Sequence, residues 1–148
     1  RLVSDPARAR AKSPNIPRVI MIASPKFYRT TNGFEVLATD ADICVRQLAM
    51  QRPHKALAVT GAVCTAVASS VVGSVVAQAI GKSLANVRLG HPSGILRVAS
   101  KVRSDADGNT IVESARIERT ARLIMEGAVY VRRRKIEILR AAMTEKQK

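Results

Sequence analysis

Cysteine and aromatic residues are scarce in this chain of 148 residues, which has two cysteines, no tryptophan and 3% aromatic residues. Cys44 and Cys64 lie in apolar surroundings, with no CxxC spacing and no neighbouring set of His and acidic side chains. That pattern argues against a disulfide framework and against a metal site. With so few aromatic rings, the core of one domain of this length must be built from Val, Ile, Leu and Ala.

Acidic residues are also few, because 11 Asp and Glu stand against 25 Lys and Arg and give a formal net charge of +14. Such an excess ordinarily indicates a nucleic acid or an acidic membrane surface as partner. Most of it lies at the two ends, in residues 1–18 and 132–148. Between them there is no basic cluster interleaved with aromatic residues, which disfavours nucleic-acid binding.

A basic-then-apolar leader is absent from the start of the sequence, so we expect a cytoplasmic location, or an organelle matrix. The longest apolar stretch, residues 58–80, would reach across a bilayer if it were helical. Its Ala and Val residues are interrupted by Thr, Ser, Gly and Gln, which argues against a membrane span. We predict instead a helix of small residues, enclosed on most sides by sheet and broken near Gly73.

Short β-branched or alternating runs between turn residues predict the strands of this sheet. The predicted strands are residues 18–23, 34–38, 43–50, 95–103, 110–117 and 128–131. Asn32–Gly33 is expected to form a turn, and residues 105–109 a hairpin loop. Residues 119–127 fit a short helix or an extended turn. Consecutive antiparallel strands with one buried helix predict an α+β lobe.

Two runs carry the functional expectation. Residues 54–68 (HKALAVTGAVCTAVA) and 90–94 (GHPSG) each join a polar loop to a helix or strand of small residues. This arrangement presents backbone N–H groups to a bound anion. Together the two runs predict a carboxylate-binding lobe of an enzyme.

With DADICVRQLAMQ (40–51) and RTARLIMEG (119–127), these runs resemble the C-terminal half of the PrpF family. That family comprises methylaconitate isomerases, aconitate Δ-isomerases, methylitaconate isomerases and oxalomesaconate tautomerases. The resemblance covers roughly residues 15–131 and keeps four motifs in the family's order. We therefore divide the chain into a basic N-terminal arm (1–14), a PrpF-like C-terminal lobe (15–131) and a basic amphipathic helical tail (132–148).

The resemblance implies one lobe of the diaminopimelate epimerase-like fold, in which an antiparallel curved sheet wraps around a central small-residue helix. It also implies a reaction class. Members of the family move a proton between carbons of an unsaturated di- or tricarboxylate, and so shift the double bond or its geometry, without metal or organic cofactor.

Such a reaction requires a base, a group that returns the proton and stabilisation of an enolate-like charge. We expect the N–H groups of Thr60 and Gly61, at a helix start, to meet one substrate carboxylate. A second carboxylate is expected at His91, Ser93 and Gly94. The candidates for the site are therefore Lys55, Thr60, Gly61, His91, Ser93 and Gly94.

The base is expected in the N-terminal lobe, which nothing in this chain resembles. Lys55 is a weaker candidate for the base and a natural point charge beside the site, although it could equally be a surface lysine. The same alternatives hold for Arg46 and His54. Related epimerases carry a catalytic thiol where this chain has Ala58, so Cys64, inside the predicted helix, is expected to be buried and inert.

Three functions stay open for the chain. The first is the substrate-binding lobe of a PrpF-like isomerase, either a fragment or one polypeptide of a split enzyme. The second is a half-length relic that acts as a binding or oligomerisation module. The third is nucleic-acid binding through the basic ends. For the first two, a second lobe, a sister chain or a homo-oligomer is expected to cover the apolar cleft face.

Overall fold

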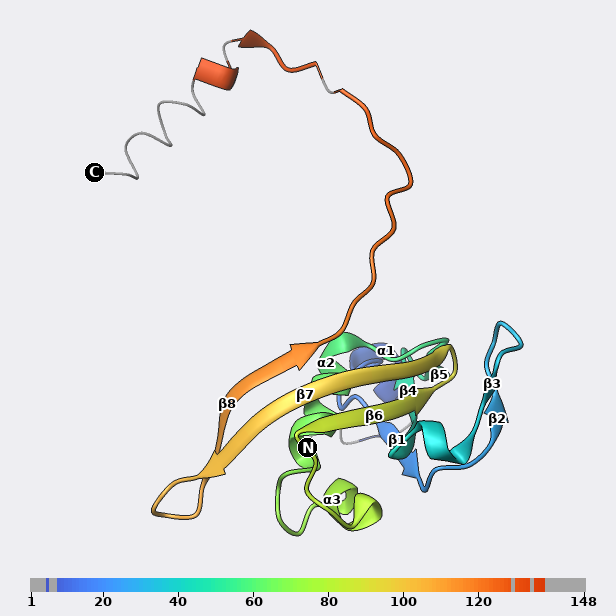
Figure 1. Cartoon of the computed structure of the whole chain (residues 1–148), viewed down its shortest axis with the longest axis vertical. Coiled ribbons are helices and arrows are strands. Elements are labelled where there is room, and N and C mark those ends of the chain that lie inside the picture. Colours follow the sequence, from blue (N-terminus) through green and yellow to red (C-terminus); the bar gives the residue numbers. More distant parts are fainter. Residues whose placement is uncertain (1–4, 6–7, 129, 134, 138–148) are drawn as a thin grey trace.

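The computed structural model describes residue 5 and residues 8–128, 130–133 and 135–137. Its main element is a six-stranded sheet in the order β1-β4-β6-β7-β8, with β5 paired to β4 (Figure 1). The strands are β1 (Ile20–Ala23), β4 (Ile43–Ala49), β5 (Arg52–Pro53), β6 (Asn86–His91), β7 (Gly94–Ser104) and β8 (Thr110–Ile117). A separate hairpin joins β2 (Tyr28–Arg29) to β3 (Glu35–Val36).

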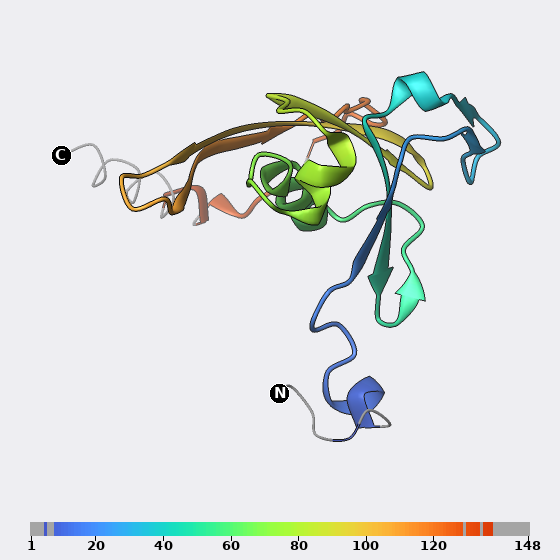
Figure 2. The ribbon, with the colours of Figure 1, turned by 90° about the horizontal axis from the view of Figure 1, so that it is seen from below.

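Several helical segments of the described residues lie before or between the strands. They are α1 (Ala9–Lys12), the 3-10 turn η2 (Ala38–Asp40), α2 (Val59–Ala68) and α3 (Val75–Ile80). Helices α2 and α3 lie together on one side of the sheet, whereas α1 lies apart from it near the N-terminus (Figure 2). Strands and helices together make an α+β architecture, as expected from the sequence.

The sheet is mixed, which corrects the prediction of consecutive antiparallel strands. β4 and β6 run parallel, with Ile43 opposite Leu89 and Cys44 opposite Gly90, while the other pairs are antiparallel. Parallel neighbours need a crossover connection, and here α2 and α3 supply it between β4 and β6. The sequence analysis missed β6 altogether, although Val87 and Leu89 alternate with polar neighbours along it.

Helix α2 begins and ends close to where the small-residue pattern predicted. The first helix ends at Ala68, and the chain then turns through Gly73 at φ +80°. The second helix, α3, follows, and the Ser74 hydroxyl accepts a hydrogen bond from the Ala77 N–H at its start. Only one stripe of α2 is buried, at Gly61, Ala62, Thr65 and Ala66. The helix is therefore covered by sheet on one side, not on most sides as expected.

The core lies between that stripe and the inner face of the sheet. Its fully buried side chains include Ile43, Val45, Val87, Leu89 and Val98, and Ala62 and Ala66 of α2 lie against them. Small residues on the helix let its backbone approach the sheet closely, so the aliphatic strand side chains fill the space without aromatic rings.

The hairpin loop at residues 105–109 is confirmed, since the Asp105 N–H donates to the Asn109 carbonyl and β7 pairs with β8. The turn at Asn32–Gly33 is also present, closed by the Gly33 N–H on the Thr30 carbonyl. Residues 119–127 form neither the predicted helix nor a turn and follow β8 without regular structure. The described residues of the predicted strand 128–131 lie in no strand, and Tyr130 is 99% exposed, because no neighbouring strand is there to pair.

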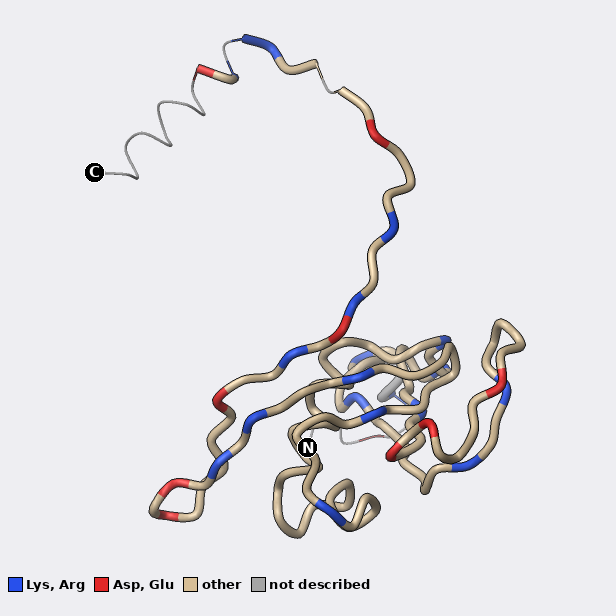
Figure 3. The backbone as a smooth tube through the Cα atoms, viewed as in Figure 1, with Lys and Arg blue, Asp and Glu red and all other residues tan. Residues whose placement is uncertain are grey.

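Most of the predicted tail helix, residues 138–148, lies outside the described residues, while residues 133 and 135–137 have helical backbone. Lys and Arg are spread along β6, β7, β8 and the segment that follows, and the acidic residues of the β7–β8 loop stand among them (Figure 3). Within the described residues, no helix is long and apolar enough to span a membrane.

Candidate functional site

The start of α2 leaves backbone donors free. Its N-cap is Ala58, which provides no side-chain cap, and the first helical bond runs from the Ala62 N–H to the Ala58 carbonyl. The N–H groups of Val59, Thr60 and Gly61 have no acceptor within the part of the chain that the structure describes. These donors, together with the positive end of the helix dipole, favour an anion at this point.

Gln47 of β4 holds this helix start in place. Its Oε1 accepts a hydrogen bond from the Ala58 N–H at 3.0 Å, and the residue is only 1% exposed. The same side chain explains the glycine at position 61, since a Cβ there would lie 2.8 Å from Oε1. The sheet therefore fixes where the free N–H groups stand.

The second predicted run forms the two-residue turn between β6 and β7. His91 pairs with Gly94, and Pro92 and Ser93 form the tip. The phenol of Tyr28 contacts both ends of this turn, at 3.0 Å from the His91 carbonyl and 2.8 Å from the Gly94 carbonyl. The Tyr28 hydroxyl, on β2, therefore fixes the backbone of the turn.

Tyr28 also accounts for the first glycine of the GHPSG run. A Cβ at Gly90 would lie 3.2 Å from the Tyr28 hydroxyl oxygen and 3.2 Å from the Ala41 Cβ. The guanidinium of Arg46 lies 4.8 Å from the centre of the Tyr28 ring and donates to the Gly90 carbonyl at 3.2 Å. Arg46, on β4, therefore contacts both the tyrosine and the turn, and its guanidinium stacks on the tyrosine ring.

The turn and the helix start are joined through the loop before α2. The Ser93 hydroxyl donates to the Lys55 carbonyl at 2.6 Å. Three residues, Ala56, Leu57 and Ala58, then connect Lys55 to Val59, the first residue of α2. Lys55 is exposed, so its ammonium group is open to solvent beside this contact.

His91 enters the site as a neutral imidazole. Its Nδ1 accepts a hydrogen bond from the Ser93 N–H at 3.2 Å, so that nitrogen carries no proton in this arrangement. Burial, helped by the nearby positive charges of Arg46 and His54, holds the pKa of His91 below its ordinary value of 6.5. At neutral pH its Nε2 is then the protonated nitrogen and a hydrogen-bond donor.

A family comparison matches residues 2–132 to PrpF, described as PrpF protein. The chain belongs to the PrpF family. Two curated relatives of this PrpF chain are a 2-methyl-aconitate isomerase of Cupriavidus necator, 38% identical over 82% of this chain and 31% of the relative, and a 3-methylitaconate isomerase of Eubacterium barkeri, 37% identical over 86% and 33%. The PrpF chain thus spans about a third of the length of these relatives.

Among solved structures, the PrpF chain is similar to the crystal structure of a methylitaconate-delta-isomerase. The TM-score is 0.62 at 32% identity, over 88% of this chain and 33% of that one. The family match begins at residue 2 and therefore extends across the segment that we had set apart as an arm.

The six site residues predicted for this PrpF chain fall into two groups. Lys55, His91, Ser93 and Gly94 meet at the β6–β7 turn, and Thr60 and Gly61 stand in the first turn of α2. The Ser93 hydroxyl donates to the Lys55 carbonyl, and the Gly94 carbonyl accepts from the Tyr28 hydroxyl. The two groups share the short loop from Lys55 to Ala58.

Three residues that lie beside the predicted ones were not predicted from the sequence: Arg18, Tyr28 and Gln47. Tyr28 and Gln47 support backbone, whereas Arg18 donates to the Thr60 hydroxyl from Nη1 at 3.2 Å. Gln47 carried a usable pattern, because it follows the buried Ile43 and Val45 on the same face of β4, where an apolar residue is expected. The prediction that Cys64 is buried is wrong: it lies on the exposed side of α2, and Cys44 is the buried thiol.

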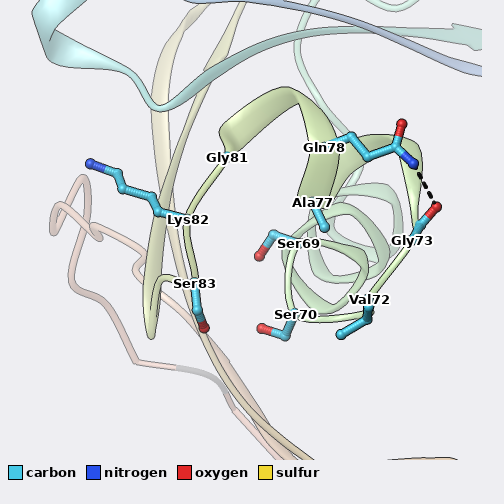
Figure 4. Close-up of a pocket in the computed structure, with 9 residues that line it drawn as sticks. All are labelled: Ser69, Ser70, Val72, Gly73, Ala77, Gln78, Gly81, Lys82 and Ser83. Atoms are coloured by element: carbon cyan, nitrogen blue, oxygen red, sulfur yellow. Dashed lines mark hydrogen bonds between the residues drawn. The ribbon is translucent and has the colours of Figure 1, made fainter.

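A hollow of about 410 Å³ lies beyond the other end of α2, between residues 69–73, α3 and residues 81–83 (Figure 4). Its lining is mostly serine and small residues, with Gln78 bonded to the Gly73 carbonyl. It contains none of the predicted site residues. No cluster of three or more His, Cys, Asp or Glu suited to a metal occurs among the described residues.

Proposed function

We propose that residues 15–131 are the C-terminal, carboxylate-binding lobe of an isomerase that moves a proton and a double bond in an unsaturated di- or tricarboxylate. Membership of the PrpF family and relatives named as 2-methyl-aconitate and 3-methylitaconate isomerases support this reaction class. The lobe is of the diaminopimelate epimerase type, with a curved sheet that covers one side of the α2 helix.

The observation that carries the proposal is the pairing of two groups of donors through one loop. Three free N–H groups stand at the start of α2, and the β6–β7 turn, bonded to Lys55, holds a neutral imidazole. A substrate with two or three carboxylates needs donors at separated points, which these two groups supply.

In this proposal the lobe stabilises charge. Removing a proton next to a carboxylate builds enolate-like charge, and fixed N–H donors stabilise that charge better than mobile water does. Nε2–H of His91 donates to a substrate oxygen, and the Lys55 ammonium adds a positive charge. Another lobe, on the same polypeptide or on a sister chain, supplies the base.

Proton NMR in D₂O tests the proposal directly. The purified 148-residue chain is incubated with cis-aconitate and with methylaconitate, and isomer formation, deuterium uptake and ligand shifts are followed. We expect binding shifts that weaken in Ser93→Ala but not in the control Ser104→Ala, which alters an exposed serine at the far end of β7.

Lys55→Ala, with Lys82→Ala as its control, decides where the base lies. Turnover by this chain alone that is lost only in Lys55→Ala would place the base at Lys55 and overturn its assignment to another lobe. A stable homodimer that ignores both acids would instead support the alternative, an inactive module for binding or oligomerisation.

A further inference from the structure

Arg18 stands at the start of α2, in a position that no motif of the sequence analysis singled out. Its Nη1 donates a hydrogen bond to the Thr60 hydroxyl at 3.2 Å. The two residues are 42 positions apart in sequence, so the fold, not local chain geometry, brings the guanidinium to the helix.

Strand alternation explains why Arg18 points to this side of the sheet. Side chains two apart on a strand share a face, and Ile20 and Ile22 of β1 pack against the α2 core. Ile20 lies directly opposite Gln47 in the β1–β4 register. Arg18, two residues before Ile20, continues the same row toward the first turn of the helix.

Gln47 provides a second, independent sign of a binding site here. The residue is 1% exposed, and its Oε1 accepts from the Ala58 N–H at the N-cap. Its Nε2 is buried without any hydrogen-bond partner, and it is the one such side-chain atom in the described part of the chain. A buried amide donor normally has an acceptor, so an unsatisfied one beside three free backbone donors points to an anionic ligand.

Arg18 forms no ion pair among the described residues. Four other arginines, Arg29, Arg88, Arg97 and Arg103, form ion pairs with carboxylates, whereas Arg18 has no acidic partner among the described residues. Its side chain is exposed, so a ligand can reach it. A guanidinium binds a carboxylate through two parallel N–H bonds, which suits it to this class of ligand.

We propose that Arg18 binds a carboxylate of the substrate at the first turn of α2, in a subsite formed with the N–H groups of Thr60 and Gly61. The inference rests on the proposed function and extends it. One carboxylate is held by Arg18 and the helix start, and a second is held at the β6–β7 turn. Gln47 holds the helix start through its Oε1, and its unpartnered Nε2 is a further donor beside Gly61.

Tricarballylate, a saturated tricarboxylate with no double bond to move, is a suitable probe. The ¹⁵N-labelled 148-residue chain is titrated with it, and the dissociation constant is read from the Gly61 amide shift. The variants are Arg18→Gln, Arg18→Lys and Arg116→Gln. The last removes the same charge from an exposed arginine of β8, and so controls for the lower net charge.

We expect Arg18→Gln to weaken binding at least tenfold and Arg116→Gln to change it less than twofold. Arg18→Lys should weaken binding less than Arg18→Gln does, because an ammonium keeps the charge but lacks the two parallel N–H donors of a guanidinium. Equal constants for Arg18→Gln and Arg116→Gln would overturn the role of Arg18 while leaving the proposed function standing. If the unaltered chain binds no tricarballylate and shows no shift with aconitate, both proposals fail.

Discussion

Gly61 and Gln47 are in contact across the helix and sheet, and the contact leaves no room for a side chain at position 61. A Cβ there would lie 2.8 Å from the Gln47 Oε1 and 3.1 Å from the Ile20 Cδ1. Gln47 cannot move away freely, because it is buried and bonded to the Ala58 N–H. The glycine is therefore required by packing as well as by any ligand.

Gly61→Ala should accordingly destabilise the protein. Overpacking at this contact costs about 1–3 kcal/mol, and the better helix propensity of alanine recovers up to about 1 kcal/mol, so we expect a net loss of about 1–2 kcal/mol. Urea unfolding monitored by circular dichroism measures it. Gly127→Ala is the control, since a Cβ there meets nothing within 4 Å. A Gly61→Ala variant as stable as the control would contradict the packing argument.

Tyr28→Phe tests the support of the β6–β7 turn. The variant removes the hydroxyl that contacts the carbonyls of His91 and Gly94, and we expect a loss of about 1 kcal/mol in the free energy of unfolding. Amide exchange at His91, Ser93 and Gly94 should also become faster. Tyr130→Phe changes the other tyrosine, which is 99% exposed, and should alter neither quantity. The same exchange rates in both variants would show that the phenol does not hold the turn.

His91 should make stability depend on pH. Its pKa lies below the ordinary 6.5 in the folded protein, because burial and then the charges of Arg46 and His54 oppose protonation. Above pH 6.5 the imidazole is neutral in both the folded and unfolded states, so the lowered pKa does not change the free energy of unfolding there. As the pH falls below that value, the unfolded chain takes up a proton first, so stability falls until the folded pKa is passed.

The measurement compares unfolding free energies at about pH 7.5 and about pH 5.5. His91→Asn keeps a side-chain acceptor for the Ser93 N–H but removes the titrating group, so its stability should change less between the two conditions than that of the unaltered chain. His54→Asn should keep most of the decline. A decline of the same size in His91→Asn would assign the pH dependence to other groups.

The Asp42–Arg88 pair should contribute more to stability than the Arg29–Glu35 pair. Asp42 accepts from the Arg88 backbone N–H at 2.8 Å and from its Nη2 at 2.8 Å, with the carboxylate side chain 8% exposed. Burial works to raise the pKa of Asp42, but the hydrogen bonds and charge of Arg88 outweigh it and hold the pKa below 3.8.

We expect Asp42→Asn to lose about 2 kcal/mol at neutral pH, because bonds to a charged partner are broken in a half-buried setting. The difference from the unaltered chain should shrink in acid, since stability from a lowered carboxyl pKa is present above the unfolded pKa and lost as the pH falls. Glu35→Gln, at a pair whose side chains are 70% and 53% exposed, should lose less than about 1 kcal/mol. Equal losses would show that burial does not distinguish the two pairs.

Local patterns predicted those parts of the fold that local chemistry determines. The DADGN loop between two alternating runs is a hairpin, and the glycine and serine after Ala68 end one helix and begin another. The start of α2 at Thr60–Gly61 was likewise predictable. By contrast, β6 depends on a parallel partner, β4, far away in sequence, and the described residues of the range 128–131 lie in no strand because no strand is there to pair with them.

In the site, too, residues set by local patterns could be predicted and residues brought in from distant segments could not. Residues within the two runs, such as His91 and Ser93, could be named in advance because the runs themselves are turn and helix-start patterns. Arg18 and Tyr28 could not, since each reaches its partner from more than forty positions away. Nothing around Arg18 in the sequence distinguishes it from the other basic residues near the N-terminus.

The parallel pairing of β4 with β6 orders the events of folding. The β6–β7 and β7–β8 hairpins join neighbouring segments and can close early, whereas β4 meets β6 only after the intervening chain, including α2 and α3, has been brought into place. The helix whose first turn forms the proposed subsite packs on β6 and β7 through that late closure. A ligand held there would bind only molecules that have completed it, and would slow their unfolding.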